Sequence, residues 1–418
     1  MKKNVWIINH YATGMLFKKG GRHYWFAKYL KREGFEPVIF SCNVRHGSQD
    51  YYFDTDKLWF EKRADEIDVP FVIVKSSLYK GNGKDRVLNM VNFYHNVQKA
   101  VKEYAKLYEK PDVIYASSVH PLALVAGIKL ARYFGIKCIC EVRDLWPETL
   151  VAYEIANNFN PIIIFLRYLE KWIYKNADSI IFTMAGGYDY IEEQGWGNDI
   201  PKAKVHYINN GIDLAQFDYN KTHFTIQDED LENENIFKVV YTGSIRRVNN
   251  LGKLIDIARH VRNPNIKFLI WGDGNELSML KNRIKNEHVN NIIFKGWVEK
   301  KNIPYITSQA DLNLAHSNGS PILRFGTSAN KLFDYMAAGK PIMRDSFAKY
   351  SPVETYHAGV SVDTGDVKDI ALAIEMMANL DKNTLKEYGL NARRGAYEFD
   401  FGNLSKKLIA IIDGINNC

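Results

Sequence analysis

The feature of the sequence that most constrains the fold is the alternation of short β-rich runs with longer helical patterns. In the first half the β-rich runs lie at 5–8, 37–40, 71–74, 113–116, 136–142 and 179–183. Helical patterns separate them, among others at 22–32, 86–108, 121–133 and 162–175, with irregular stretches at 11–21, 43–68 and 80–86. This order predicts parallel strands joined by crossover helices, which is the α/β doubly wound class.

The same pattern restarts near residue 208. Further β-rich runs lie at 239–241, 266–271, 292–295, 311–315, 342–343 and 360–362, and the acidic tract 228–234 reads as a surface loop. Two α/β units of about 200 residues each predict two Rossmann-like domains, 1–207 and 208–399, facing across a cleft. A last helix, about 400–418, carries apolar residues at 401, 404, 408, 411, 412 and 415. We expect that apolar stripe to pack back on the first domain.

The composition excludes several classes of protein. The chain has four cysteines, and Cys138 and Cys140 lack neighbouring histidine or cysteine partners, so neither a disulfide framework nor a zinc site is expected. The apolar run 5–8 is too short for a signal peptide, and the cluster 162–166 is too short to cross a bilayer. No run of Lys and Arg accompanies the net charge of +7, which argues against nucleic acid as a partner. We therefore expect a cytoplasmic protein.

The stretch 325–341, FGTSANKLFDYMAAGKP, reads as a loop that turns into a ligand-facing helix. Gly326 permits unusual backbone angles, and Thr327 and Ser328 are candidates to cap the helix start. On the helix, Lys331 and Asp334 lie one turn apart on one face. Helix N–H groups with an ammonium suit a phosphate, and a carboxylate suits sugar hydroxyls. The spacing alone equally fits a surface helix with a Lys/Asp pair.

Other candidate residues also follow β-rich runs, where ligands sit in doubly wound sheets. They are Gly20 and Gly21 after the first run, Arg143 and Asp144 after the run 136–142, and Gly243 and Arg246 after the run 239–241. Asp144 has two interpretations, as a functional carboxylate or as a turn residue before Pro147. Trp146 reads either as a core residue or as a ligand contact.

Nine segments together resemble family 4 glycosyltransferases of the two-domain GT-B architecture, in the family's order. They are Gly20-Gly21, VRDLWPE at 142–148, NADSIIF at 176–182, INNGIDLAQF at 208–217, YTGSI at 241–245, WGDGNE at 271–276, FKGWV at 294–298, ADLNLA at 310–315 and SANKLFDYMAAGKPI at 328–342. The resemblance is typical of enzymes of bacterial surface-polysaccharide assembly, such as capsule or O-antigen synthesis. It does not identify a substrate.

The resemblance implies that the second half binds a nucleotide sugar. Asp334 matches the second residue of the family's pair of glutamates, which grips the ribose, whereas the first position is Gly326. The family's two basic residues after the first strand of this half correspond to Ser244 and Asn249. Arg246, Arg247 and Lys331 are therefore the remaining candidates for the diphosphate, and Arg246 is better placed than Arg247 in the loop after the strand. The other expected donor contacts are Gly243, Gly274, Ser328, Ala329 and Asn330, with Gly20 and Gly21 from the first half.

The resemblance also implies the reaction. We expect transfer of a sugar, an N-acetylated hexose or a deoxyhexose, from a UDP-sugar with retention at the anomeric carbon. No covalent enzyme nucleophile and no metal or other cofactor is expected, so cationic groups that stabilise the leaving diphosphate dominate the chemistry. Arg246 and Lys331 fill that role, while Arg143 and Asp144, at the position where many members carry a histidine, act near the acceptor. His120 follows a different strand.

Other functions remain open at this point. Asp54-Thr-Asp56 and Asp228-Glu-Asp230 imitate a metal-binding Asp-x-Asp motif, but the two-domain layout does not suit the fold that uses it. Glycine patterns at 14–21 and 272–274 lack the third glycine of a dinucleotide-binding fingerprint, which argues against an NAD enzyme. A sugar-nucleotide epimerase of GT-B type and a degenerate, non-catalytic subunit remain as alternatives.

The acceptor implied by the resemblance is a saccharide or a lipid-linked saccharide. Residues 1–205 hold 29 Lys and Arg against 23 Asp and Glu, an excess of six positive charges. One hypothesis is that the loop 80–86 and the helix 162–175 face an anionic membrane surface, which would make the protein peripheral at the inner face of the cell membrane. The favoured interpretation of that helix is an ordinary half-buried one.

Overall fold

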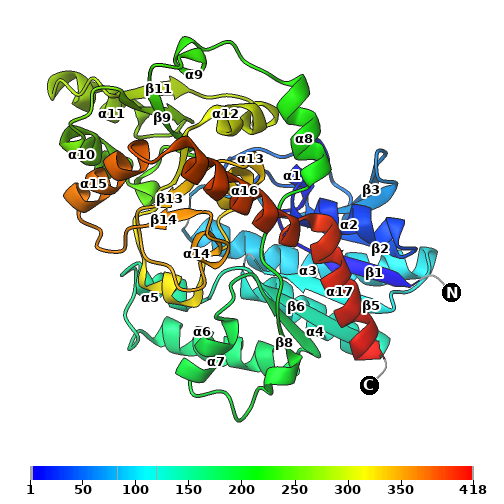
Figure 1. Ribbon diagram of the computed structural model, residues 1–418. Coiled ribbons are helices and arrows are strands. Elements are labelled where there is room, and N and C mark those ends of the chain that lie inside the picture. Colours follow the sequence, from blue (N-terminus) through cyan, green and yellow to red (C-terminus); the bar gives the residue numbers. More distant parts are fainter. Residues whose placement is uncertain (1–2, 82, 119, 417–418) are drawn as a thin grey trace. The chain divides into compact units, whose positions relative to one another are not determined.

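The computed structural model describes residues 3–81, 83–118 and 120–416, which fold as two α/β units (Figure 1). Unit 1 comprises Met1–Asn209 together with Phe401–Cys418, and unit 2 comprises Asn210–Asp400. Each unit is built on one sheet of its own. The observed architecture is the α/β class that the alternation of β-rich and helical segments predicts.

The sheet of unit 1 has eight strands within the described residues, in the order β3-β4-β2-β1-β5-β6-β7-β8. Their bounds are β1 Asn4–Ile8, β2 Glu36–Cys42, β3 Trp59–Ala64, β4 Val69–Val74, β5 Val113–Ser117, β6 Lys137–Val142, β7 Ser179–Phe182 and β8 Val205–Tyr207. Neighbouring strands are parallel, with Val5 opposite Pro37 and Val113, except for β3, which is antiparallel to β4. The order reverses between β1 and β5, so the loops after these two strands flank the sheet's switch point.

Strand β3 corrects the prediction that 43–68 is irregular. It lies at the edge of the sheet and carries Glu61, Lys62 and Arg63 in its centre. Charged side chains are common on edge strands because they discourage pairing with other chains. They also remove the apolar signal by which a strand is recognised.

Helices cover both faces of this sheet (Figure 1). The helices of unit 1 are α1 Thr13–Lys18, α2 Arg22–Arg32, α3 Lys84–Leu107, α4 Pro121–Phe134, α5 Glu148–Ala152, α6 Pro161–Asn176, α7 Gly187–Glu193 and α17 Phe401–Asn416, with the 3-10 turn η1 Lys202–Lys204. Two predicted loops are therefore partly helical, because α1 lies within 11–21 and α3 begins at Lys84.

Helix α17 packs against α2 in the core of unit 1. Phe401, Leu404, Leu408 and Ile412 are buried there, and the Phe26 and Phe401 rings meet edge to face at 5.4 Å. The same core includes side chains from the central strands β1, β5 and β6. The last helix is thus part of the fold of unit 1.

The sheet of unit 2 has six parallel strands within the described residues, in the order β11-β10-β9-β12-β13-β14. Their bounds are β9 Phe237–Thr242, β10 Ile266–Trp271, β11 Ile292–Gly296, β12 Leu312–Ala315, β13 Ile342–Arg344 and β14 Gly359–Ser361. The order reverses between β9 and β12. The loops after these two strands therefore diverge and leave a crevice at the carboxyl edge of the sheet.

The helices and 3-10 turns of unit 2 surround this sheet. They are α8 Leu214–His223, α9 Glu229–Glu232, η2 Arg247–Asn249, α10 Gly252–His260, α11 Leu277–Asn286, η3 Lys300–Asn302, α12 Ile303–Gln309, η4 Pro321–Phe325, α13 Asn330–Ala338, α14 Pro352–Thr355, α15 Val367–Ala378 and α16 Lys382–Glu398. The acidic tract 228–234 is not a free loop. Asp228 caps α9, and Lys295 pairs with both Asp228 and Asp230, at 2.8 and 2.5 Å. Within the described residues, no helix combines the length and the apolar character needed to cross a bilayer.

Replacing Leu408 by alanine should destabilise unit 1. The side chain is fully buried, and deleting it leaves a cavity, so we expect a loss of about 2–5 kcal/mol in the free energy of unfolding. Leu390 in α16 is 57% exposed and is the matched control, for which Leu390→Ala should cost less than about 0.5 kcal/mol. Denaturant titration followed by circular dichroism measures both. Equal effects would show that α17 is not a structural part of unit 1.

Candidate functional site

The first turn of α13 lies at the switch point of the sheet of unit 2. Lys331 Nζ donates to the carbonyl of His316, which directly follows β12, over 3.0 Å. The same ammonium lies 3.3 Å from the hydroxyl of Tyr241 in β9 and 4.4 Å from the centre of that ring. Lys331 is thus held between the two strands at which the order reverses, where doubly wound sheets bind ligands.

The backbone before α13 explains why its first turn is open. Gly326 has φ of 104°, a conformation that favours glycine. Among the described residues no side chain caps the helix, whose N-cap is Ala329, so the prediction that Thr327 or Ser328 caps it is wrong. The carbonyl of Ser328 instead accepts from Asn210 Nδ2 over 2.7 Å. Uncapped N–H groups at a helix start favour an anion.

Burial changes the protonation of Lys331. Loss of water lowers the pKa of its ammonium to about 8, although the negative charge of Asp345 acts in the opposite direction. The group is therefore still mostly charged at neutral pH and loses its proton as pH rises through about 8. An anion that binds beside it would favour the charged form.

Asp334 lies one turn further along α13. Its side chain is half-buried, and burial raises the pKa of its carboxyl, against the positive charge of Lys300 in η3. Within the described part of the chain no hydrogen bond to this carboxylate is formed. The carboxylate is influenced by the charge of Lys300 in the segment after β11, whereas Lys331 contacts residues at β9 and β12. The two charges thus lie one helical turn apart on α13 and face different segments of unit 2.

The loop after β9 carries Gly243 and Arg246. The Arg246 side chain is exposed, and the residue precedes η2. A Cβ at Gly274 would lie 2.0 Å from the carbonyl oxygen of Ile245, and one at Gly272 would lie 1.8 Å from that of Gly243. Gly272 and Gly274 therefore let the loop after β10 pack directly on the loop after β9, which is a structural reason for both glycines.

Trp297 is a residue that the sequence analysis did not single out. It directly follows β11, at the carboxyl edge, and 68% of its surface is exposed. An exposed tryptophan ring offers a flat face for stacking. The available signal was an aromatic residue immediately after a predicted strand, within the segment FKGWV.

In unit 1 the switch point between β1 and β5 holds two buried histidines. His10 Nδ1 and His120 Nε2 are 2.6 Å apart, and the His10 ring stacks on Phe93 with a centroid distance of 4.1 Å. Burial lowers the pKa of His120 to about 3 and, together with the proximity of His120, lowers that of His10 well below its ordinary value. Both rings are therefore neutral at physiological pH, and one donates to the other.

Gly20 and Gly21 precede α2 in the same unit. Gly21 is the N-cap of α2 with φ of 120°, and a Cβ there would come within 3.0 Å of the Met15 side chain. Glycine is thus required by the backbone at this helix start, independently of any ligand.

The first residue of α2, Arg22, belongs to a buried charge network. Its Nε donates to Glu141 Oε2 over 2.6 Å, and its other nitrogens donate to the carbonyls of Ile208 and Asn209. Tyr115 and Ser117 donate to the same carboxylate. Although burial acts in the opposite direction, the charge of Arg22 and the contact with His23 hold the pKa of Glu141 well below its usual range. The network connects α2 and β6 to Ile208 and Asn209, which end the first segment of unit 1.

Arg143 and Asp144 directly follow β6. The backbone N–H of Arg143 donates to Ser118 Oγ over 3.0 Å, which ties this loop to the one after β5. The protein around Asp144 excludes water and so raises the pKa of its carboxyl, while the positive charges of Arg143 and Arg86 act in the opposite direction. Part of the Asp144 surface remains exposed to solvent. Asp144 also lines a cavity of about 20 Å³, with room for one water molecule, whose other wall includes Trp146 and the buried Glu170.

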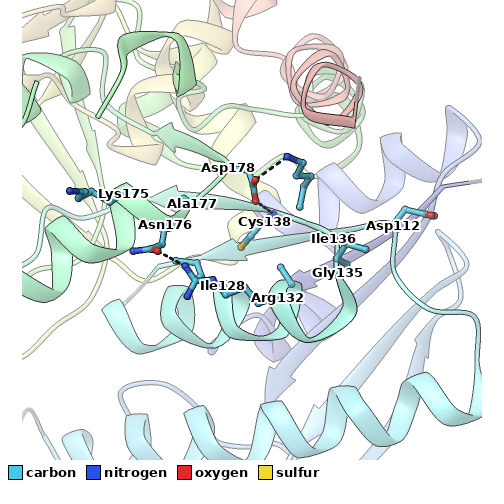
Figure 2. Close-up of a pocket in the computed structure, with 12 residues that line it drawn as sticks. Asp112, Ile128, Arg132, Gly135, Ile136, Cys138, Lys175, Asn176, Ala177 and Asp178 are labelled. Carbon is cyan, nitrogen blue, oxygen red and sulfur yellow. Dashed lines mark hydrogen bonds and ion pairs between the residues drawn. The ribbon is translucent and has the colours of Figure 1, made fainter. Parts of the chain in front are cut away.

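A larger pocket of unit 1, of about 710 Å³, lies at the opposite, amino edge of the sheet (Figure 2). Its charged side chains are already engaged. Asp178 accepts from the backbone of Cys138 and pairs with Lys137 at 3.3 Å, and Arg132 donates to Asn176. The basic residues here neutralise the ends of α4 and α6, where helix dipoles are negative. This pocket collects none of the candidate residues.

The candidate residues thus form two groups, one at the carboxyl edge of each sheet. In unit 1 the group is Gly20, Gly21, Arg143 and Asp144. In unit 2 it is Gly243, Arg246, Gly274, Gly326, Ser328, Ala329, Asn330, Lys331 and Asp334.

Comparison with known proteins identifies the family of the chain. The family model described as "Glycosyltransferase Family 4" matches residues 24–216, and the model "Glycosyl transferases group 1" matches residues 223–395. The chain belongs to glycosyltransferase family 4. A probable glycosyltransferase WbjE of Pseudomonas aeruginosa is 21% identical over 288 residues, which cover 65% of this chain and 68% of that protein.

Solved structures share the two-domain GT-B fold with this glycosyltransferase. A sucrose-phosphate synthase of Thermosynechococcus elongatus has a TM-score of 0.71 and 15% identity, with 100% of both chains covered. Anabaena HepE in complex with UDP has a TM-score of 0.67 and 15% identity, covering 99% of this chain and 100% of that one. A structure titled trehalose-6-phosphate from E. coli, bound with UDP-2-fluoro glucose, has a TM-score of 0.73 and 10% identity, covering 98% and 99%.

The buried network at Glu141 leads to a stability prediction. Glu141→Gln removes the negative charge but leaves the Arg22 guanidinium buried, which should cost about 3–5 kcal/mol of unfolding free energy. Glu287→Gln is the control because Glu287 pairs with Arg283 at 2.7 Å at the solvent-exposed end of α11, where ion pairs contribute little to stability. Denaturant titrations at neutral pH compare the two. A loss below about 1 kcal/mol for Glu141→Gln would contradict the assignment of an ionised, stabilising carboxylate.

Proposed function

We propose that this glycosyltransferase transfers a sugar from a UDP-sugar to a saccharide or lipid-linked saccharide. The observation that carries the proposal is the order of groups along the carboxyl edge of unit 2. The open start of α13 with Lys331 comes first, Asp334 follows one turn later, and the exposed Trp297 follows β11. This order matches the diphosphate, ribose and base of a nucleotide.

The dimensions of the sheet support this assignment. Trp297 follows β11, which is two strands away from β9 in the sheet. Strands lie about 4.8 Å apart, so the distance along the edge is about 10 Å, which a nucleoside diphosphate can span. Similar folds have been solved with UDP and with UDP-2-fluoro glucose, which supports uracil as the base.

The charges suggest how the reaction proceeds. Bond cleavage at the anomeric carbon leaves negative charge on the departing diphosphate, and Lys331, Arg246 and the helix start would stabilise it. Asp144, with Arg143 beside it, would position the acceptor hydroxyl. We assign retention of anomeric configuration and independence of metal and other cofactors, in keeping with the family, and an N-acetylated hexose or deoxyhexose as the transferred sugar.

An exposed apolar surface on unit 1 supports a lipid-linked acceptor. It consists of side chains from the end of α5 to the first half of α6, here termed the α6 surface. These are Tyr153, Ile155, Phe159, Ile162, Ile164, Phe165 and Tyr168, exposed by 44 to 88%. Contiguous exposed apolar patches mark interaction sites. We propose that the α6 surface rests on the inner face of the cell membrane during polysaccharide assembly.

The α6 surface differs from the one expected from sequence. Leu169 and Trp172 are half-buried, and Arg167 and Lys171 pair with Glu148 and Asp199. The membrane contact would therefore depend mainly on apolar insertion by the first half of α6, with less contribution from the charges of its second half.

Donor binding and transfer should respond differently to variants of the two units. Asp334→Ala and Lys331→Ala should each weaken UDP binding more than tenfold, because they remove a ribose acceptor and a diphosphate cation.

Arg246→Ala should lower kcat about 100- to 1000-fold if it stabilises the departing diphosphate. Asp144→Ala should cut transfer while leaving UDP affinity nearly unchanged. Calorimetry with UDP, and turnover with anomeric analysis of fresh product by NMR, measure these effects.

Two results would contradict this assignment. Unchanged UDP affinity in Asp334→Ala would exclude the ribose contact. An inverted anomeric configuration in the fresh product would exclude retention.

Membrane association should depend on the α6 surface. Phe159→Ser and Phe165→Ser each remove an exposed aromatic ring that would contribute about 1.5–3 kcal/mol on insertion, so the double variant should cosediment at least tenfold less with vesicles containing anionic lipid. Leu372→Ser, 57% exposed in unit 2, is the control and should behave as wild type. Equal sedimentation of the double variant and wild type would remove the membrane proposal.

A further inference from the structure

A buried histidine–aspartate pair lies beneath the open start of α13. His316 directly follows β12, and its Nδ1 meets the Oδ2 of Asp345, which directly follows β13. The other ring nitrogen, Nε2, lies 3.1 Å from the carbonyl oxygen of Asn250, in the loop after β9. A carbonyl only accepts, so Nε2 is the donor in that contact.

This pair joins the loops that follow three neighbouring strands. The second oxygen of Asp345 accepts from the backbone N–H of Ser317 over 3.1 Å, and the hydroxyls of Ser317 and Ser346 are 2.6 Å apart. One imidazole and one carboxylate therefore hold the loops after β9, β12 and β13 together. The first of these loops carries Arg246.

The pair also influences the position and the pKa of Lys331. The ammonium donates to the backbone carbonyl of His316, so that carbonyl fixes where the charge sits. The groups that face it are Tyr241 from β9, His316 after β12 and Asp345 after β13. The charge of Asp345 raises the pKa of Lys331, against the effect of burial.

The location of the pair argues for a role beyond stability. His316 and Asp345 are 1% and 0% exposed, and burying such groups gives little net stabilisation compared with apolar side chains of similar size. They lie at the carboxyl edge, where the candidate residues of unit 2 gather. At the amino edge of the same sheet, Lys238 and Asp311 form the corresponding polar contact, at 3.6 Å, far from those residues.

We propose that His316 and Asp345 are positioning residues that preorganise Lys331 and the Arg246 loop for the diphosphate of the donor. This inference rests on the proposed binding of a nucleotide sugar by unit 2. Neither side chain needs to touch the ligand, because they act through the backbone carbonyl of His316 and through the loop after β9.

The first test measures UDP affinity by calorimetry at pH 7.5 in wild type, Asp345→Asn, His316→Asn and the double variant. Each single variant should bind UDP at least tenfold more weakly. Because the two residues act together, the double variant should bind UDP no more than about threefold more weakly than the weaker-binding single variant. Additive losses in the double variant would contradict a shared role.

The second test measures UDP affinity as a function of pH. If the pair had only a structural role, the pH midpoint of this affinity would be the same in wild type and variant. In wild type, UDP affinity should fall as pH rises through about 8, because Lys331 loses its proton there. In Asp345→Asn that fall should move to lower pH, since the carboxylate no longer favours the ammonium. An unmoved midpoint would contradict the proposed control of Lys331 by Asp345.

Controls separate this inference from the proposed function and from misfolding. Asp311→Asn alters the corresponding carboxylate at the amino edge and should lower the melting temperature while leaving UDP affinity unchanged. If wild type does not bind UDP, the proposed function fails; if wild type binds and Asp345→Asn binds equally well, only the pair's role fails.

Should Asp345→Asn lose its native circular dichroism, Ser317→Ala removes the milder link to Ser346. That variant should weaken UDP binding about two- to fivefold, and unchanged affinity would contradict the proposal.

Discussion

The reversal of strand order in each sheet is the constraint on which the rest of the structure depends. Parallel strands bring all their carboxyl ends to one edge, and at the reversal two neighbouring loops leave toward opposite faces of the sheet. In unit 2 this happens between β9 and β12, where the start of α13 fills the crevice with Lys331. In unit 1 it happens between β1 and β5, where His10 meets His120. Ligand-directed chemistry concentrates at these points because backbone N–H groups and side chains from several loops converge there without disturbing the apolar core.

The sequence was sufficient to predict the two α/β units and most of their strands, because the central strands are buried runs of Val, Ile and Phe that need no partner to be recognised. It was insufficient where an element depends on tertiary contacts. Strand β3 carries three consecutive charged residues and exists because β4 offers it a free edge. Helix α9 has four residues and is held by Asp228 and by the ion pairs of Lys295. Neither contact can be read from local periodicity.

The candidate site divides in the same way. Gly326 was recognisable from the sequence because only glycine readily adopts its backbone angle, and Lys331 and Asp334 were recognisable because helical spacing fixes their shared face. The family pattern added the roles that are expected of them. Trp297 and the pair of His316 with Asp345 were not foreseen, since their significance comes from the ends of strands that are adjacent in the sheet but distant in the sequence. An isolated histidine after a strand carries no signal until the neighbouring loops are known.

The structure of unit 2 compensates in part for the two basic residues of the family pattern that this chain lacks. At the two positions where the family carries basic residues, Ser244 and Asn249 hydrogen-bond each other at 2.8 Å, so the loop after β9 keeps its shape without those charges. Lys331 is instead half-buried, which costs free energy while no anion is present and lowers its pKa. The same loss of water strengthens its attraction to an anion, because charges interact more strongly where the dielectric constant is low. One desolvated ammonium at an uncapped helix start can therefore replace part of what two exposed cations would supply, provided that the carbonyl of His316 holds it in place.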